Sequence, residues 1–482
     1  MRNFTHILLG GLLLCSSKLS AQQNFYTDTF SPTQLQEDFQ QYLDVFYELH
    51  PSLYWYTSKE NIDQQIASIS EQLNEPRTAF EFYHLLASLT ANFNCGHTGI
   101  NPAYSYRESI DRSFPLEFQY MGNELYLFYD YETETYPLKA IASINGRTVQ
   151  EILDRISSHR GTDGYIDSPD PLVFNNSEGF SYHYQLAFQD TSNYEITFTD
   201  GSNLVRKPIS GDRLEELRDK LYPRAPYIKS QILPEKNIAI LTVNTFGKSA
   251  LKATNSEYKK ALANFFKEVR KNGIENMVLD MRTNGGGEDN YASHLYRYLT
   301  QEPFQYYEEL ALKSLPFDES VYDKASVPRE LKNGLVRGFF TRKKPDKHIV
   351  KPNFRVKGLR TQRPKSKSFT GTLYILTSGY TYSAAAELSA YCQAYRPNTT
   401  FIGAETGGAV QGNTSGLSAF LRLKHSKFGA YIPLIRYNMN VEVPKEGRGV
   451  IPDYPMENSL NSRKEGKDDL LEFVFSQVKG NE

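Results

Sequence analysis

The chain has 482 residues, which is more than one hydrophobic core usually organises, so more than one domain is expected. Its 54 Lys and Arg residues nearly balance its 56 Asp and Glu residues, and the net charge is −2 at pH 7. This balance gives the molecule no overall attraction for polyanions, so nucleic acid is not expected as a partner.

The first 21 residues have the order of a secretory signal peptide. Arg2 precedes an apolar run over residues 7–14, and a Leu-Ser-Ala sequence ends at Ala21. We expect cleavage after Ala21 and export of a soluble protein to the periplasm or the cell exterior. Lipidation of Cys15 is the less favoured alternative, because the residue before it is a bulky leucine. No later stretch has the roughly 18 consecutive apolar residues of a membrane-spanning helix.

Apolar periodicity predicts two domains in the first half of the mature chain. Residues 22–112 repeat apolar side chains at spacings of three and four, which predicts a small helical domain. Residues 113–210 alternate apolar and polar side chains between Asn-Gly and Asp-Gly pairs, which predicts a β-rich module. Within it, residues 140–152 (AIASINGRTVQEI) resemble part of a PDZ domain, and a hairpin followed by a helix is the equally favoured alternative. Residues 211–236 are expected to be a linker.

Residues 237–475 predict an α/β domain, because buried strands alternate with helices. The expected strands are 238–243, 276–280 and 373–377, and the expected helices are 255–271 and 383–395. An insertion is expected over residues 303–370. Part of it, residues 337–368, holds 12 Lys or Arg residues and one acidic residue, Asp346. This segment could bind an anionic substrate, glycan or lipid headgroup, but a solvated lid or loop is favoured.

Residues 373–387 (LYILTSGYTYSAAAE) run from the predicted strand through a glycine-containing turn into an alanine-rich helix headed by Ser383. A hydroxyl there lies near backbone N–H groups without an intrahelical partner and near the positive end of the helix dipole. Both stabilise the charge that develops when a nucleophile attacks a carbonyl. Ser383 is therefore a candidate nucleophile, although a serine at a helix start is more often only a cap.

A second segment, residues 276–287 (NMVLDMRTNGGG), ends a predicted strand and continues into three consecutive glycines. Without side chains, the glycines let the backbone approach a ligand and point N–H groups at it. Such a loop can form an oxyanion hole, although a glycine run by itself is more often a flexible turn. A third segment, residues 94–100 (NCGHTGI), holds His97. The pKa of a histidine lies near neutrality, so His97 is a candidate general base. A lone histidine there is more often a surface residue.

In chain order, HPSLYWY, CGHT, INGRTV, DMRTNGGG, TYSAAAE, GAETGG and EGRGVIPD resemble the motifs of the C-terminal processing, or tail-specific, serine peptidases. The resemblance covers almost the whole mature chain and is closer to the tricorn-core-like branch. It implies a multidomain α/β fold with a ClpP/crotonase-like spiral catalytic domain, and a serine endopeptidase that acts on proteins or peptides without a metal or other cofactor.

The same resemblance implies the catalytic roles. One branch of the family uses a lysine about 25 residues after the nucleophile, but here no lysine occurs between Ser383 and Lys424. The other branch uses His and Glu, which makes His97 the base and Glu446, in EGRGVIPD, its orienting carboxylate. Glu442 is the reserve candidate. Part of that branch carries a serine or aspartate beside the histidine, where this chain has cysteine and glycine.

The implied reaction is acyl transfer, in which Ser383 attacks the carbonyl and His97 takes its proton. The oxyanion would be held by backbone N–H groups of Gly286 or Gly287 and Ala384. The residues expected to brace the glycine loop rather than touch substrate are Asp280, Arg282 and Asn284.

Two further expectations concern the cysteines and the rival functions. Cys392 lies about 13 Å along the helix from Ser383 at 1.5 Å per residue, so a bridge to Cys95 is not expected and both thiols should be free. One rival is an inactive protein of the same fold that binds a lipophilic ligand. A second is a scaffold in which the β-rich module binds peptide C-termini.

Overall fold

The computed structural model describes residues 23–166, 171–190, 192–222, 225–254, 257–315, 317–318, 320–325, 331, 338–352 and 356–479. The expected signal peptide, including Cys15, lies outside these residues. In the described part of the chain, no helix is both long and apolar enough to span a membrane.

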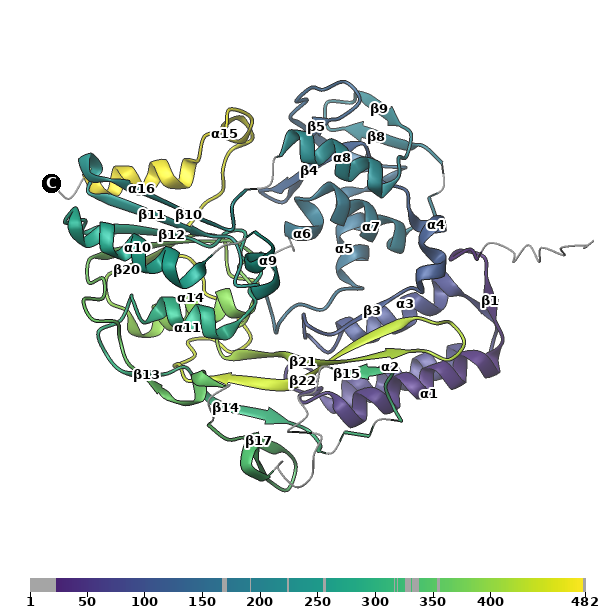
Figure 1. Ribbon diagram of the computed structural model, residues 1–482. Coiled ribbons are helices and arrows are strands. Elements are labelled where there is room, and N and C mark those ends of the chain that lie inside the picture. The colour runs from purple at the N-terminus through teal and green to yellow at the C-terminus, as the bar shows by residue number, and fades with distance from the viewer. Residues whose placement is uncertain are drawn as a thin grey trace, which may run out of the picture.

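The N-terminal part is helical, as its periodicity predicts. Its helices are α1 (Pro32–Leu49), α2 (Lys59–Gln72) and α3 (Ala79–Ala91). Each begins at a serine or threonine whose hydroxyl accepts a backbone N–H, and α1 and α3 add the reciprocal bond of a capping box. In Figure 1 these helices lie together at the N-terminal, purple end of the molecule.

The β-rich part forms a sheet of its own with the strand order β4-β5-β6-β8-β9, and β7 pairs with β6. Its strands are β4 (Leu116–Met121), β5 (Glu124–Asp130), β6 (Lys139–Ile144), β7 (Arg147–Thr148), β8 (Tyr194–Phe198) and β9 (Asn203–Arg206). The helices α5 (Val149–Ser157) and α7 (Ser177–Ala187) pack on it and share a separate apolar core. Asn145 and Gly146 both have positive φ, which a tight hairpin turn requires.

The segment expected to be a linker, residues 211–236, is instead built into both neighbouring units. Helix α8 (Gly211–Leu221) packs Leu214 against Phe128 and Tyr131 of the β-rich part. Strand β10 (Ile228–Leu233) is the edge strand of the next sheet. The linker prediction was wrong because charged residues on an exposed helix face resemble those of an unstructured segment.

The next unit is built on a six-stranded sheet with the order β10-β11-β12-β19-β20-β23. Strands β11 (Ile238–Val243), β12 (Asn276–Asp280), β19 (Thr372–Thr377), β20 (Thr399–Gly403) and β23 (Tyr454–Pro455) run parallel, and β10 runs antiparallel. The expected strand ranges are therefore confirmed, because buried parallel strands are continuous apolar runs.

Helices cover both faces of this sheet. Alternate residues of β11 enter two different cores: Leu241 packs on the side of α10 (Tyr258–Lys271) and α14 (Ala384–Tyr395), and Ile240 on the side of α16 (Asp469–Lys479). Figure 1 shows α16 on one side of the strands, and α10, α11 (Asp289–Tyr296) and α14 on the other. The result is a three-layer α/β arrangement.

A second, seven-stranded sheet joins the helical and α/β parts. Its order is β15-β21-β22-β14-β17-β16, with β3 (Gly99–Asn101) also paired to β22. The other strands are β14 (Tyr307–Leu312), β15 (Lys324–Ala325), β16 (Thr341–Lys343), β17 (His348–Val350), β21 (Gly412–Arg422) and β22 (Gly429–Met439). Four of these strands come from residues 303–370. Two of them, β16 and β17, lie within residues 337–368, so the described part of the basic segment contributes strands to this sheet and is not only a solvated loop.

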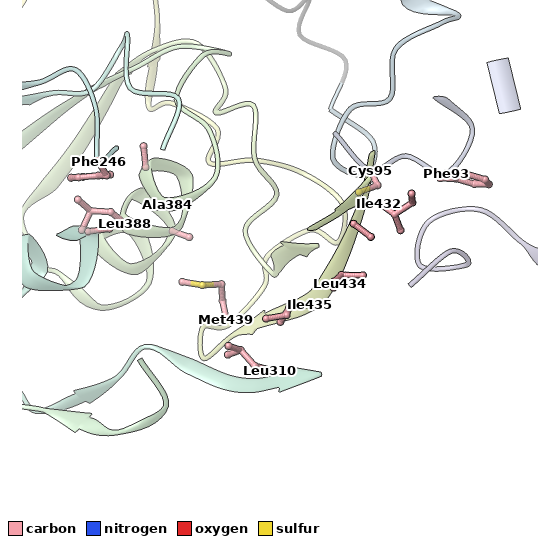
Figure 2. Packing of buried hydrophobic residues seen from close by; sticks show 14 of the residues in the cluster. Phe93, Cys95, Phe246, Leu310, Ala384, Leu388, Ile432, Leu434, Ile435 and Met439 are labelled. Atoms are coloured by element: carbon pink, nitrogen blue, oxygen red, sulfur yellow. The ribbon is translucent and has the colours of Figure 1, made fainter. Parts of the chain in front are cut away.

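One apolar core runs through both parts. Figure 2 follows it from Phe93 at the end of α3, past Ile432 and Leu434 of β22, to Ala384 and Leu388 of α14. The helical part is thus fixed against the helix that begins after Ser383. Cys95 and Cys392 are buried in this core and free, which confirms the expectation of two unbridged thiols.

Candidate active site

Ser383 occupies a strained turn between β19 and α14. Its backbone has φ 51° and ψ −128°, values that a residue with a side chain adopts at a cost of about 1–3 kcal/mol. Its side chain caps none of the N–H groups of α14, so the common role of a serine at a helix start is not the one seen here. A strained turn of this kind between a strand and a helix is typical of a nucleophilic serine, because it exposes the serine Oγ to the substrate.

The glycine loop after β12 presses directly against Ser383. A side chain at Gly286 would place its Cβ 2.7 Å from Ser383 Cβ and 2.8 Å from the Tyr382 carbonyl oxygen. The φ angles of Gly286 and Gly287, 96° and 133°, also lie where residues with side chains are strained. Close approach and backbone conformation therefore both require glycine at these two positions.

The N–H groups at this contact differ in what they bind. The Gly286 N–H donates to Oδ1 of Asn284 at 2.9 Å. Within the described residues, the N–H groups of Gly287 and Ala384 have no hydrogen-bond acceptor. Of the three donors predicted from the sequence, Gly287 and Ala384 are therefore the two that can receive an oxyanion without first breaking a bond.

The loop is tied to its surroundings by Asp280, Arg282 and Asn284. Asn284 is fully buried, and its Nδ2 donates to the Val243 carbonyl at 3.0 Å. Arg282 donates to Asp280 through Nε (2.9 Å) and Nη2 (2.7 Å), and to Asp468 through Nη1 (3.0 Å) and Nη2 (2.6 Å). These bonds join the loop to the start of α16.

We expect Arg282→Met to lower the free energy of unfolding by about 2–3 kcal/mol, because it leaves two partly buried carboxylates without their cation. Urea unfolding measures the change. Arg213→Met is the matched control, since Arg213 pairs with Glu216 where both side chains are more than half exposed, and it should change stability by less than about 0.5 kcal/mol. Equal effects of the two substitutions would refute a stabilising network at Arg282.

His97 lies in the turn that leads into β3, and its ring stacks on Tyr382, the residue before Ser383. The ring centroids are 4.7 Å apart, and the Tyr382 hydroxyl lies 3.1 Å from His97 Nδ1. Pairing of β3 with β22 anchors the turn to the seven-stranded sheet. Burial lowers the pKa of His97 below its ordinary value, while the charge of Asp163 opposes that shift.

Asp163 is a carboxylate beside His97 that the sequence motifs did not reveal. It is 2% exposed, and its Oδ1 accepts the Gly96 N–H at 2.8 Å. Its position depends on two neighbouring glycines: a Cβ at Gly161 would lie 3.2 Å from the Cys95 carbonyl, and Gly164 has φ 67°. In the sequence, the two glycines on either side of Asp163 were the only feature that could have pointed to this residue. They were not specific, because glycines occur in many ordinary loops.

The two glutamates chosen from the sequence, Glu446 and Glu442, are both exposed. Neither hydrogen-bonds to His97 within the described residues. The backbone of the Glu446 loop does reach the site region, since Tyr165 N–H donates to the Gly447 carbonyl at 2.7 Å. The buried glutamate of the GAETGG motif, Glu405, instead binds the Arg448 side chain and the Gly449 N–H.

A cavity of about 280 Å³ adjoins these groups. Gly96 and Tyr382 line it on the His97 side, and Gly285 lines it on the glycine-loop side. Thr162 lines both this cavity and a wider groove of about 960 Å³, which runs between α2, α3 and the end of α5. The site therefore has room beside Tyr382 and a polar path leading to it. Among the described residues, no cluster of His, Cys, Asp or Glu has the arrangement of a metal site.

Residues 237–456 match the model of peptidase family S41. No curated protein matches the sequence. The chain is similar to the structure of mature CPAF complexed with lactacystin, with 12% identity, coverage of 93% of this chain and 100% of that chain, and a TM-score of 0.61. A mutant of CPAF shares 12% identity over 93% of this chain and 97% of its own chain, with a TM-score of 0.63. The photosystem II D1 C-terminal processing protease shares 13% identity over 88% of this chain and 93% of its own chain, with a TM-score of 0.41. At 12% identity, the likeness to CPAF shows a shared fold.

Proposed function

Through residues 237–456 the chain belongs to peptidase family S41 and is a serine-type peptidase, and on this premise we propose that Ser383 is its nucleophile. The observation that carries the proposal is the Ser383 turn. It combines a strained backbone, a hydroxyl that caps no helix N–H, and direct contact with the glycine loop.

His97 is the proposed general base. Because its Nδ1 faces the Tyr382 hydroxyl, Nε2 is the nitrogen available to take the Ser383 proton. Ser383 Oγ attacks the scissile carbonyl, the protonated His97 gives its proton to the leaving amine, and water releases the acyl-enzyme. The N–H groups of Gly287 and Ala384 stabilise the oxyanion, an interaction worth on the order of 3 kcal/mol per donor.

The substrate is proposed to be a protein or peptide chain cut by endopeptidase action. Export by residues 1–21 and a PDZ-like role for residues 113–210 in presenting substrate tails complete the proposal. The carboxylate that orients His97 is treated separately below, because Glu446 and Glu442 are exposed and the described contacts of His97 involve neither.

Covalent labelling tests this function. The mature chain, residues 22–482, is incubated with a fluorophosphonate probe and digested, and the labelled peptide is mapped. We expect one modified residue, Ser383, together with cleavage of unfolded casein, and the loss of both in Ser383→Ala. A fluorophosphonate reacts only with a serine whose proton a base removes, so labelling separates an active site from an inactive ligand-binding fold.

Ser389→Ala is the matched control on the same helix. The Ser389 hydroxyl donates to the Ala385 carbonyl within α14, so its loss should leave labelling and cleavage unchanged. A wild-type chain that neither takes up the probe nor cuts casein would overturn the proposed function.

A further inference from the structure

The contacts of His97 raise the question of where the proton on its Nδ1 goes. To accept the Ser383 proton at Nε2, the neutral imidazole must carry its hydrogen on Nδ1. Its partner there, at 3.1 Å, is the Tyr382 hydroxyl oxygen. If that oxygen accepts from Nδ1–H, the hydroxyl hydrogen of Tyr382 needs an acceptor of its own.

Asp163 is placed to be that acceptor. A Cβ built on Gly96 would lie 2.2 Å from the Tyr382 hydroxyl oxygen and 3.4 Å from Asp163 Oδ1, so both groups converge at Gly96. The Gly96 N–H occupies Oδ1. The second oxygen, Oδ2, is buried and has no hydrogen-bond partner among the described residues. A buried carboxylate oxygen left in this state is costly unless a donor serves it during function.

Electrostatics favour the same arrangement. Burial raises the pKa of the Asp163 carboxyl, and His97, the Gly96 N–H and the Tyr382 hydroxyl each oppose that rise. The charge of Asp163 in turn supports the protonated form of His97, against the effect of burial. These two groups therefore stabilise each other's charged forms, which is what an orienting carboxylate does for an imidazolium.

We infer that Asp163 is the carboxylate that positions His97, acting through the Tyr382 hydroxyl. This inference rests on the proposed function of His97 as the general base. His97 Nδ1–H donates to Tyr382 Oη, and the Tyr382 O–H donates to the Asp163 carboxylate. No proton is transferred along it: Asp163 stays ionised, and the imidazolium that forms in the reaction is stabilised by the aligned hydroxyl. Gly96 is glycine because any side chain would displace that hydroxyl.

The experiment compares Asp163→Asn, Tyr382→Phe and the double variant. Asparagine can still accept the Gly96 N–H, and phenylalanine keeps the ring that stacks on His97. We expect Asp163→Asn and Tyr382→Phe each to lower kcat by about 10²- to 10⁴-fold, with KM within about threefold of wild type. Because the two residues act in one chain, the double variant should be no more than about threefold slower than Asp163→Asn.

The pH profile distinguishes a positioning role from a purely structural one, because a structural loss alone would not shift the acid limb of activity. Without the carboxylate the imidazolium is less stable, so the acid limb of kcat/KM in Asp163→Asn should move to lower pH than in the wild type. Tyr395→Phe, on the solvent-exposed end of α14, is the matched control and should change neither rate nor profile.

Glu446→Gln tests the competing carboxylate in the same assays. The inference is overturned if Asp163→Asn keeps wild-type kcat and acid limb, or if Glu446→Gln alone shows the loss and the shift. Fluorophosphonate labelling of wild-type Ser383 distinguishes this failure from that of the proposed function. Labelling with an unaffected Asp163→Asn variant overturns only the positioning role, whereas no labelling in wild type overturns both.

Discussion

In the His97→Ala variant, kcat/KM for peptide hydrolysis is expected to fall by about 10⁴- to 10⁶-fold. Alanine leaves Ser383 in its strained turn but removes the group that takes the hydroxyl proton. At neutral pH an unassisted serine is almost entirely protonated and reacts very slowly. Because the base and nucleophile act as one unit, His97→Ala should be nearly as slow as Ser383→Ala, and the double variant should be no slower than either.

A fluorogenic peptide, excess enzyme and single-turnover conditions give the range needed for this measurement. The matched control is His425→Ala, which removes a histidine that binds Glu37 at the edge of the helical part, away from Ser383. That control should retain activity within about twofold. Activity in His97→Ala within tenfold of wild type would remove His97 from the mechanism.

The same role predicts the acid limb of the pH profile. His97 must be neutral to accept a proton, and burial lowers its pKa below about 6.5, the ordinary histidine value. Activity should therefore persist as the pH falls through 6.5 and be lost only as it passes through the lowered pKa. An acid limb above the ordinary histidine pKa would contradict the lowering of the His97 pKa by desolvation.

The parts of the fold that could be predicted are those fixed by local chemistry. Parallel strands buried on both faces must be apolar runs, so the ranges 238–243 and 276–280 match β11 and β12 in the structure. The Asn145-Gly146 turn was equally visible, because the two positive φ angles it needs favour those residue types. In both cases, the apolar runs of the strands and the Asn-Gly turn, the residues that specify the structure lie within a few positions of it.

The seven-stranded sheet had no comparable signal. Its strands come from residues 99–101, from 307–350 and from 412–439, and their pairing depends on contacts between distant parts of the chain. Edge strands of two or three residues, such as β15 and β16, are too short to show a period. The basic composition of residues 337–368 pointed to a hydrated loop and concealed β16 and β17.

The candidate site divides in the same way. The glycine loop was visible because a crowded backbone with positive φ requires glycine. Ser383 was visible because it heads an alanine-rich helix and lies in a motif that resembles those of the peptidase family. Asp163 was not visible, because an aspartate between two glycines is also typical of a surface turn. Only the folded chain brings residues 160–166 against the His97 turn, where the Gly96 N–H binds the carboxylate.

Gly287→Ala is expected to be the most disruptive single-methyl change in the site. The added Cβ would lie 2.3 Å from the Phe246 carbonyl carbon and 2.4 Å from the Gly247 nitrogen, which are backbone atoms that no side-chain rotation can clear. The loop is also held there by two bonds: Phe246 N–H donates to Gly286, and Glu288 N–H to Phe246, both at 2.9 Å. At φ 133° alanine is strained even without the contact.

The loop must therefore move, break these bonds and carry the Gly287 N–H away from the carbonyl site. We expect kcat to fall by about 10²- to 10³-fold, as for removal of one oxyanion donor, and stability to fall by about 3 kcal/mol. Kinetics and urea unfolding measure the two losses separately. Gly338→Ala is the control, since nothing lies within 4 Å of its added Cβ, and it should be neutral in both assays. If Gly287→Ala kept wild-type kcat, the oxyanion would have to be bound by donors other than the Gly287 N–H.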